Sequence, residues 1–100
     1  MSGDPPSPDP LAALRDRFRA RCADDLATLS GATPAGLLDE PHATTIHRLA
    51  GAAGSFGFTA LGEIAQRLDA ARKAGAPGPS EDLELLRVEL AQAAGARSTE

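Results

Sequence analysis

The sequence predicts an all-α fold, an antiparallel up-and-down bundle of four helices. Four segments carry apolar residues at helical spacing, Gly and Pro residues separate them, and no segment alternates apolar and polar residues as a strand does. With 100 residues, 42% hydrophobic and only three aromatic, the chain suits one domain with an aliphatic core. Four amphipathic helices with short connections can bury their apolar faces against one another in a bundle.

The first predicted helix follows a short N-terminal tail. Residues 1–8 hold three prolines and no periodic pattern, so we expect them to be disordered. Asp9 is a favourable N-cap, and Pro10 stands where a helix tolerates proline best. One apolar stripe then continues to an expected end near Gly31. It contains Leu11, Leu14, Phe18, Cys22, Leu26 and Leu29. The lone cysteine in this stripe is expected to be buried and unpaired.

Turn-forming residues separate the first and second predicted helices. Residues 31–41 are predicted to connect them, with room for a short helical turn that packs Leu37 and Leu38. The second helix is predicted to begin between residues 39 and 43 and to end near Gly57. This helix carries the residues that point to a function.

Start and stop signals delimit the third and fourth predicted helices. Thr59 is a candidate N-cap and Gly75 ends the third helix, whereas Ser80, followed by acidic residues, is a strong start for the fourth. One face of the third helix carries Leu61, Ile64, Ala65, Leu68 and Arg72, and the stripe of the fourth carries Leu83, Leu86, Leu90 and Ala94. The bundle domain is therefore expected over residues 9–96, with a flexible C-terminus over residues 97–100.

His47 is the most informative residue, because it lies on the wrong side of its helix for a core residue. At about 100° per residue, the apolar residues of this helix gather on one face, with His47 opposite two of them. They are Ile46, Leu49, Ala53 and Phe56. We therefore expect the imidazole to point into solvent.

The residues around His47 are small. Gly51 and Gly54 follow it by one and two turns, and Ala43 and Ala50 lie alongside. Each glycine costs roughly 1 kcal/mol relative to alanine in an exposed helix. We infer that this surface is kept low so that another macromolecule can approach the ring closely.

These residues form a motif. It consists of a histidine, an apolar residue two places on, a position that is usually basic, a glycine, and then an apolar residue and a second glycine. They are His47, Leu49, Ala50, Gly51, Phe56 and Gly57. Over nearly its whole ordered length, the chain resembles the histidine-containing phosphotransfer (HPt) domains of bacterial and eukaryotic two-component phosphorelays.

The resemblance implies that His47 accepts a phosphoryl group from an aspartyl phosphate on a receiver domain and passes it to the aspartate of another receiver. The implied partners are receiver domains of response regulators or hybrid histidine kinases. A neutral imidazole offers a nucleophilic nitrogen near physiological pH. The receiver brings its own Mg²⁺, so this chain itself needs no cofactor. The sequence has no Walker-type phosphate loop and no kinase-like catalytic set, so ATP-dependent autophosphorylation is not expected.

The resemblance also implies roles for four further residues. Asp69 corresponds to a Glu or Gln that often hydrogen-bonds the second ring nitrogen, so its carboxylate is expected to orient the ring and stabilise an imidazolium-like charge. Because Asp is one methylene shorter than Glu, the contact could also run through water or be absent. Lys73, one turn on, corresponds to a basic residue that contacts phosphate in some members. Ala50 stands where the family usually has Lys or Arg, which we expect to slow or destabilise phosphorylation without abolishing it. Arg48, about 100° round the helix, would compensate only in part.

Composition and spacing argue against several other functions. The net charge is −4 without a basic stripe, and Trp and Tyr are absent, so nucleic acid is not an expected partner. No apolar run approaches the roughly 20 residues of a membrane span, and the N-terminus lacks signal-peptide features. We expect a cytoplasmic monomer. His42 is expected to have a structural or capping role, and its five-residue spacing from His47 argues against a shared metal ion.

Three alternatives remain open. The chain could be a non-catalytic adaptor that binds and inhibits a histidine kinase or a receiver, an interpretation that only Ala50 favours. It could also be a structural four-helix module whose histidine is incidental. Asp69 and Lys73, four residues apart, could be a solvent-exposed ion pair without a role at the site.

Overall fold

The computed structural model describes residues 10–77 and 79–95. In these residues the chain forms four α-helices and two short 3₁₀ turns, and no strand. The elements in order are α1 (Pro10–Leu29), η1 (Ala35–Leu38), α2 (His42–Ala52), η2 (Ala53–Phe56), α3 (Thr59–Lys73) and α4 (Ser80–Gly95). The predicted tails over residues 1–8 and 97–100 and the predicted N-cap at Asp9 lie outside the described residues.

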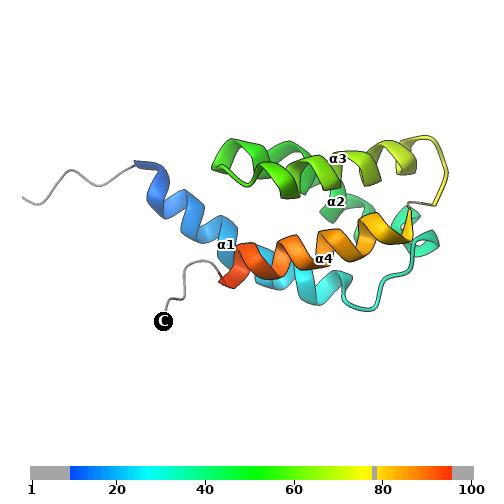
Figure 1. Cartoon of the computed structure of the whole chain (residues 1–100), viewed down its shortest axis with the longest axis horizontal. Coiled ribbons are helices and arrows are strands. Elements are labelled where there is room, and N and C mark those ends of the chain that lie inside the picture. The colour runs from blue at the N-terminus through cyan, green and yellow to red at the C-terminus, as the bar shows by residue number, and fades with distance from the viewer. Residues whose placement is uncertain (1–9, 78, 96–100) are drawn as a thin grey trace, which may run out of the picture.

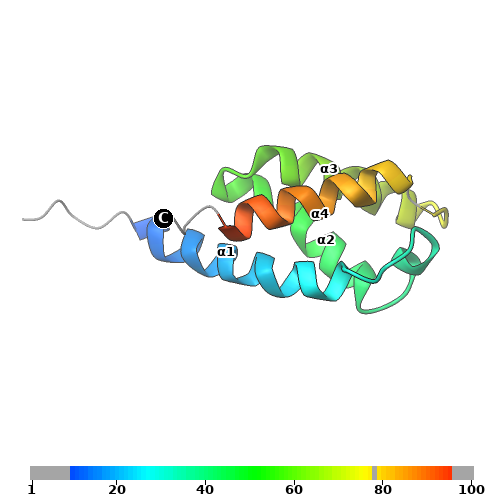
Figure 2. The ribbon, with the colours of Figure 1, turned by 60° about the horizontal axis from the view of Figure 1, so that its bottom comes forward.

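The four helices form an antiparallel bundle in which each reverses the direction of the one before (Figure 1). Helix α2 packs against α3, α1 packs against α4, and α3 also contacts α4. Figure 2 shows α1 and α4 side by side, with the first turns of α1 extending beyond the other helices. The predicted all-α four-helix bundle is confirmed.

The core follows the apolar stripes of all four helices. Its largest fully buried side chains are Leu29, Ile46, Leu49, Leu61, Leu68, Leu86, Leu90 and Cys22. The prediction is wrong for Leu11 and Leu14, which are both exposed. The first turns of α1 extend past the neighbouring helices (Figure 1), and Leu14 lines an open hollow beside Ala52 and Phe56. In η1 only Leu37 is buried, and Leu38 lies at the surface.

One predicted cap differs from the structure, and one predicted helix start is confirmed. Helix α3 begins at Thr59 itself, and the cap residue is Phe58, without a side-chain cap bond. Helix α4 begins at Ser80, as predicted, and the Leu83 N–H donates to the carbonyl of Pro79. At the end of α3, Gly75 has a φ of 75° and stops the helix as predicted.

The segment after α2 is held by two glycines. Gly57 has a φ of 90°, a left-handed conformation that strains any residue with a Cβ, and here the chain turns from η2 towards α3. Gly62 is buried where α3 meets η2, and a Cβ at this position would lie 3.2 Å from the backbone nitrogen of Gly54. The two glycines therefore position the turn that carries Gly54.

Gly57→Ala and Gly51→Ala should change stability in opposite directions. The Gly57 substitution places a Cβ in the left-handed region, and we expect the free energy of unfolding to fall by about 1–2 kcal/mol. Gly51 lies in α2 with open space around it, and there alanine should add about 0.5–1 kcal/mol. Thermal unfolding followed by circular dichroism measures both. Equal effects of the two substitutions would contradict this account of the turn.

Candidate functional site

His47 projects from α2 into solvent, as predicted. Its side chain is 63% exposed, whereas Ile46 and Leu49 beside it are buried. The ring is nevertheless anchored, because its Nδ1 lies 3.1 Å from Oδ2 of Asp69 on α3. This direct contact agrees with the expected ring-orienting position of Asp69. The shorter side chain reaches the ring without a bridging water because α2 packs closely on α3.

Asp69 is a buried carboxylate surrounded by donors. The residue is only 5% exposed, and its Oδ1 accepts hydrogen bonds from Nε and Nη2 of Arg72 at 3.1 and 2.8 Å. Lys73 Nζ lies 3.2 Å from Oδ2, the oxygen that also faces His47. Asp69 and Lys73 thus form an ion pair, but its acidic member is buried.

The surroundings of Asp69 keep it ionised. Burial raises the pKa of this carboxyl, but the hydrogen bonds from Arg72, His47 and Lys73 outweigh burial and bring the pKa down to about 2. At neutral pH the carboxylate can therefore only accept a hydrogen bond, so the proton between the two groups lies on Nδ1 of His47. The lone pair of the neutral ring is then on Nε2, the nitrogen that Asp69 does not contact.

Acid should weaken the fold through Asp69. The pKa of this carboxyl is lower in the folded state than its ordinary value of 3.8. Such a group stabilises the folded state at a pH above 3.8, and this stabilisation is lost as the pH falls towards the folded pKa. Between about pH 4 and pH 2 we expect a loss of about 2 kcal/mol from this group. Urea unfolding at several pH values compares wild type with Asp69→Asn. An identical pH slope in the two proteins would contradict the ionised, hydrogen-bonded carboxylate.

Arg72 belongs to the site, although the sequence analysis placed it only on the inner face of its helix. Its side chain is 26% exposed and reaches Asp69 by the i,i+3 spacing. The spacing of three residues between an acidic and a basic residue on one helix was the sequence signal that could have predicted this contact. With Arg72 and Lys73, two cations lie within reach of the histidine's partner.

A shallow hollow of about 170 Å³ adjoins the histidine. Its walls come from the loop before α2, from α2 and from α3. The lining residues are Glu40, Ala43, Thr44, His47 and Arg72. The Glu40 carboxylate accepts hydrogen bonds from the backbone N–H and the hydroxyl of Thr44, which hold it at the rim.

The small-residue face continues from His47 along α2 and η2. Gly51 and Gly54 are exposed, and a Cβ built on either would meet nothing within 4 Å. Beside them the carbonyl of Ala50 accepts a hydrogen bond from Nε2 of Gln66 on α3. We call the surface of His47, Ala50, Gly51 and Gly54 the histidine face.

Arg48 lies apart from the histidine face. Its guanidinium donates two hydrogen bonds, at 2.8 and 3.1 Å, to the carboxylate of Asp25 on α1. Asp25 is buried, so this pair ties α2 to α1. Arg48 was expected to compensate in part for the missing charge at position 50, and the structure gives it another partner because its helix position faces α1.

The remaining candidates lie away from this chemistry. His42 has a structural contact, as predicted, because its Nδ1 lies 3.1 Å from the carbonyl oxygen of Gly36. Within residues 10–77 and 79–95, no three His, Cys, Asp or Glu side chains gather in a way that could hold a metal ion. No helix in the same residues is long and apolar enough to cross a membrane.

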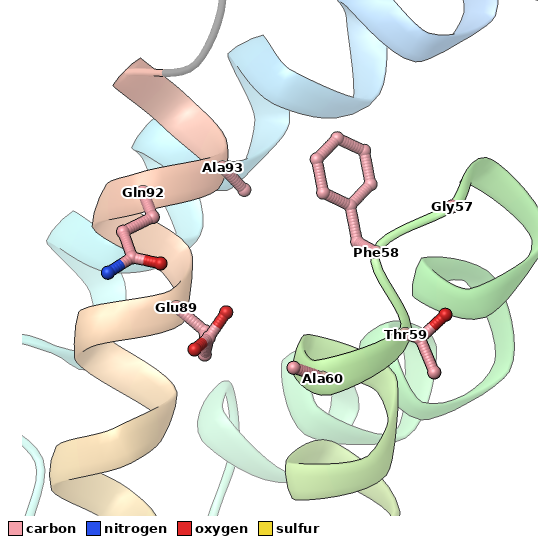
Figure 3. Close-up of a pocket in the computed structure, with 7 residues that line it drawn as sticks. All are labelled: Gly57, Phe58, Thr59, Ala60, Glu89, Gln92 and Ala93. Carbon is pink, nitrogen blue, oxygen red and sulfur yellow. The ribbon is translucent and has the colours of Figure 1, made fainter.

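A larger cavity, of about 380 Å³, lies between the start of α3 and the C-terminal half of α4 (Figure 3). Phe58 and Ala93 face it across the gap, and Glu89 and Gln92 lie along its α4 side. It is at the opposite end of α3 from Arg72 and Lys73, so it takes no part in the histidine site.

The fold and the site together define a helical bundle that presents one anchored, exposed histidine on a face of small residues. The family model of the Hpt domain matches residues 13–96, and the chain belongs to this family. No curated protein and no solved structure matches the chain significantly. Membership points to histidine phosphotransfer in two-component signalling, in which Hpt domains are phosphocarriers rather than kinases.

Proposed function

We propose that this protein carries a phosphoryl group on Nε2 of His47 between the receiver domains of response regulators or hybrid histidine kinases. The observation that carries the proposal is the contact between His47 Nδ1 and the ionised Asp69, which leaves Nε2 as an exposed nucleophile. Family membership supports it. In this proposal the protein acts in the cytoplasm as a monomer and binds neither nucleotide nor metal.

The proposed transfer needs little from this chain beyond a positioned nucleophile. The Nε2 lone pair of His47 attacks the phosphorus of the receiver's aspartyl phosphate, and the bond between phosphorus and the aspartate oxygen breaks. The electron pair leaves with the receiver's carboxylate, and the proton on Nδ1 stays in place. The ring becomes a phosphorylated imidazolium, whose positive charge the Asp69 carboxylate stabilises. The receiver supplies Mg²⁺, and the reverse reaction delivers the group to a second receiver.

The experiment that tests this function is transfer from a phosphorylated receiver. The purified full chain is incubated with a receiver labelled on its aspartate and with Mg²⁺. We expect label on this chain that is labile in acid and stable in alkali, as a phosphoramidate is, and its release to a second, unlabelled receiver. Binding without label across several receivers would contradict the proposal.

Gly54→Leu should block docking and leave the fold intact. A receiver can approach the histidine face closely only while its side chains are small. A leucine at position 54 would add a bulky side chain two turns from His47. Because a Cβ at Gly54 meets nothing within 4 Å, the bundle should keep its stability. The control is Gly95→Leu, the same substitution at an equally open position on α4. Transfer at the wild-type rate by Gly54→Leu would refute this docking surface.

Ala50 favours a second candidate, a phosphate-free adaptor that binds a histidine kinase or a receiver and inhibits it. The position lacks the usual cation, and its backbone carbonyl accepts a hydrogen bond from the uncharged amide of Gln66. The two functions differ in their need for the nucleophile. A His47→Gln variant that retained full activity in cells would favour the adaptor.

A further inference from the structure

Arg72 has an unused donor beside the phosphoryl acceptor. Its Nε and Nη2 both bond Asp69, which fixes the guanidinium, whereas the described residues offer no hydrogen-bond partner for Nη1. The residue lines the same hollow as His47. Lys73 differs, because its Nζ contacts Asp69, its side chain is 60% exposed, and it does not line the hollow. Arg72 is therefore the more preorganised of the two cations.

The lining of the hollow also includes a negative charge, that of Glu40. Thr44 donates two hydrogen bonds to Oε1 of Glu40, at 3.1 and 2.6 Å. Those bonds, and to a smaller extent the charge of Arg72, lower the pKa of the Glu40 carboxyl, so it is ionised at neutral pH. A phosphoryl group on His47 would thus share this hollow with one cation, Arg72, and one anion, Glu40.

We propose that Arg72 binds the phosphoryl oxygens on His47 through Nη1, in place of the cation absent at Ala50, and that Glu40 opposes it. This inference rests on the function proposed above. A guanidinium held by one carboxylate can present its remaining N–H groups to phosphate in a fixed geometry. Glu40 competes for the same guanidinium and repels the phosphoryl dianion. The two residues together then set how far the equilibrium favours phosphorylated His47.

The test measures the equilibrium constant for transfer between one receiver and the full chain. Arg72→Gln should lower the constant about tenfold, because a charge-assisted hydrogen bond is lost. Arg72→Lys should lower it less, and Glu40→Gln should raise it about twofold. Adding Ala50→Lys to Arg72→Gln should restore part of the loss. Arg17→Gln, which removes an exposed charge from α1, is the control for net charge.

Three results would overturn the inference. The first is wild-type behaviour of Arg72→Gln. The second is a fall in the constant for Glu40→Gln, and the third is an equal loss in Arg17→Gln. Circular dichroism shows whether Arg72→Gln folds. If it does not fold, the equilibrium constants of Arg72→Lys and Glu40→Gln still test the inference. If the wild type takes up label and Arg72→Gln has an unchanged equilibrium constant, this inference alone is refuted. If the wild type takes up no label, the proposed function is refuted as well.

Discussion

A His47→Gln variant will take no phosphoryl group from a receiver that labels the wild type. Glutamine has a similar reach, but its amide nitrogen lends its lone pair to the carbonyl and is not a nucleophile. Because the native ring is 63% exposed and its only polar contact that the structure describes is with Asp69, the substitution should leave the bundle folded. Transfer followed by gel autoradiography measures the loss, which we expect to be complete.

The matched control is His42→Gln, a change of the second histidine. His42 lies on the same helix, but it contacts the carbonyl of Gly36 and lies outside the histidine face. It should retain full labelling. Residual alkali-stable label on His47→Gln, or its loss from His42→Gln with the fold intact, would show that His47 is not the carrier.

Asp69→Asn should slow transfer about a hundredfold without abolishing it. Asparagine keeps the size of the side chain but removes the charge that stabilises the phosphorylated imidazolium. Its amide can also donate to Nδ1 of His47, which would place the ring proton on Nε2 and block the nucleophile. Single-turnover transfer at saturating receiver measures the rate. The fall should appear in the rate, with receiver affinity little changed, because Asp69 is buried beneath the surface.

The control for this effect is Asp82→Asn. Asp82 is another buried aspartate, paired with Arg67 between α4 and α3, so its loss removes a similar ion pair that does not include His47. Asp82→Asn should lose some stability and keep the wild-type transfer rate. An equal fall in rate for both variants would mean that Asp69 acts through stability alone.

The fold could be predicted from the sequence because its signals are local. The apolar spacing in α3 and α4 predicts a helix without any knowledge of the neighbouring helices. The same is true of the glycine that ends α3. The errors lie where tertiary context decides. Leu14 continues a periodic stripe, but it lines an open hollow beside Ala52 and Phe56 and stays exposed. Likewise Gly62 has no distinctive sequence signal, since only the approach of η2 shows why it is small.

The candidate site was predictable in part. The exposure of His47 follows from its angle to Leu49, a property of one helix. The resemblance implied Asp69 as the partner of the ring, but whether its shorter side chain touches the ring directly depends on how closely two helices pack, which the sequence does not state. Arg48 and Arg72 were misjudged for the same reason. Each arginine forms an ion pair with one aspartate, and only the structure shows which aspartate it is.

The most direct test of the account is to identify the phosphorylated atom. The protein, labelled with ¹⁵N in its histidine rings, is phosphorylated by a receiver and studied by NMR under mildly alkaline conditions. We expect phosphorus bonded to Nε2 of His47, with a proton retained on Nδ1 and held by Asp69. Phosphorus on Nδ1, on another residue, or on no residue of this chain would contradict the account.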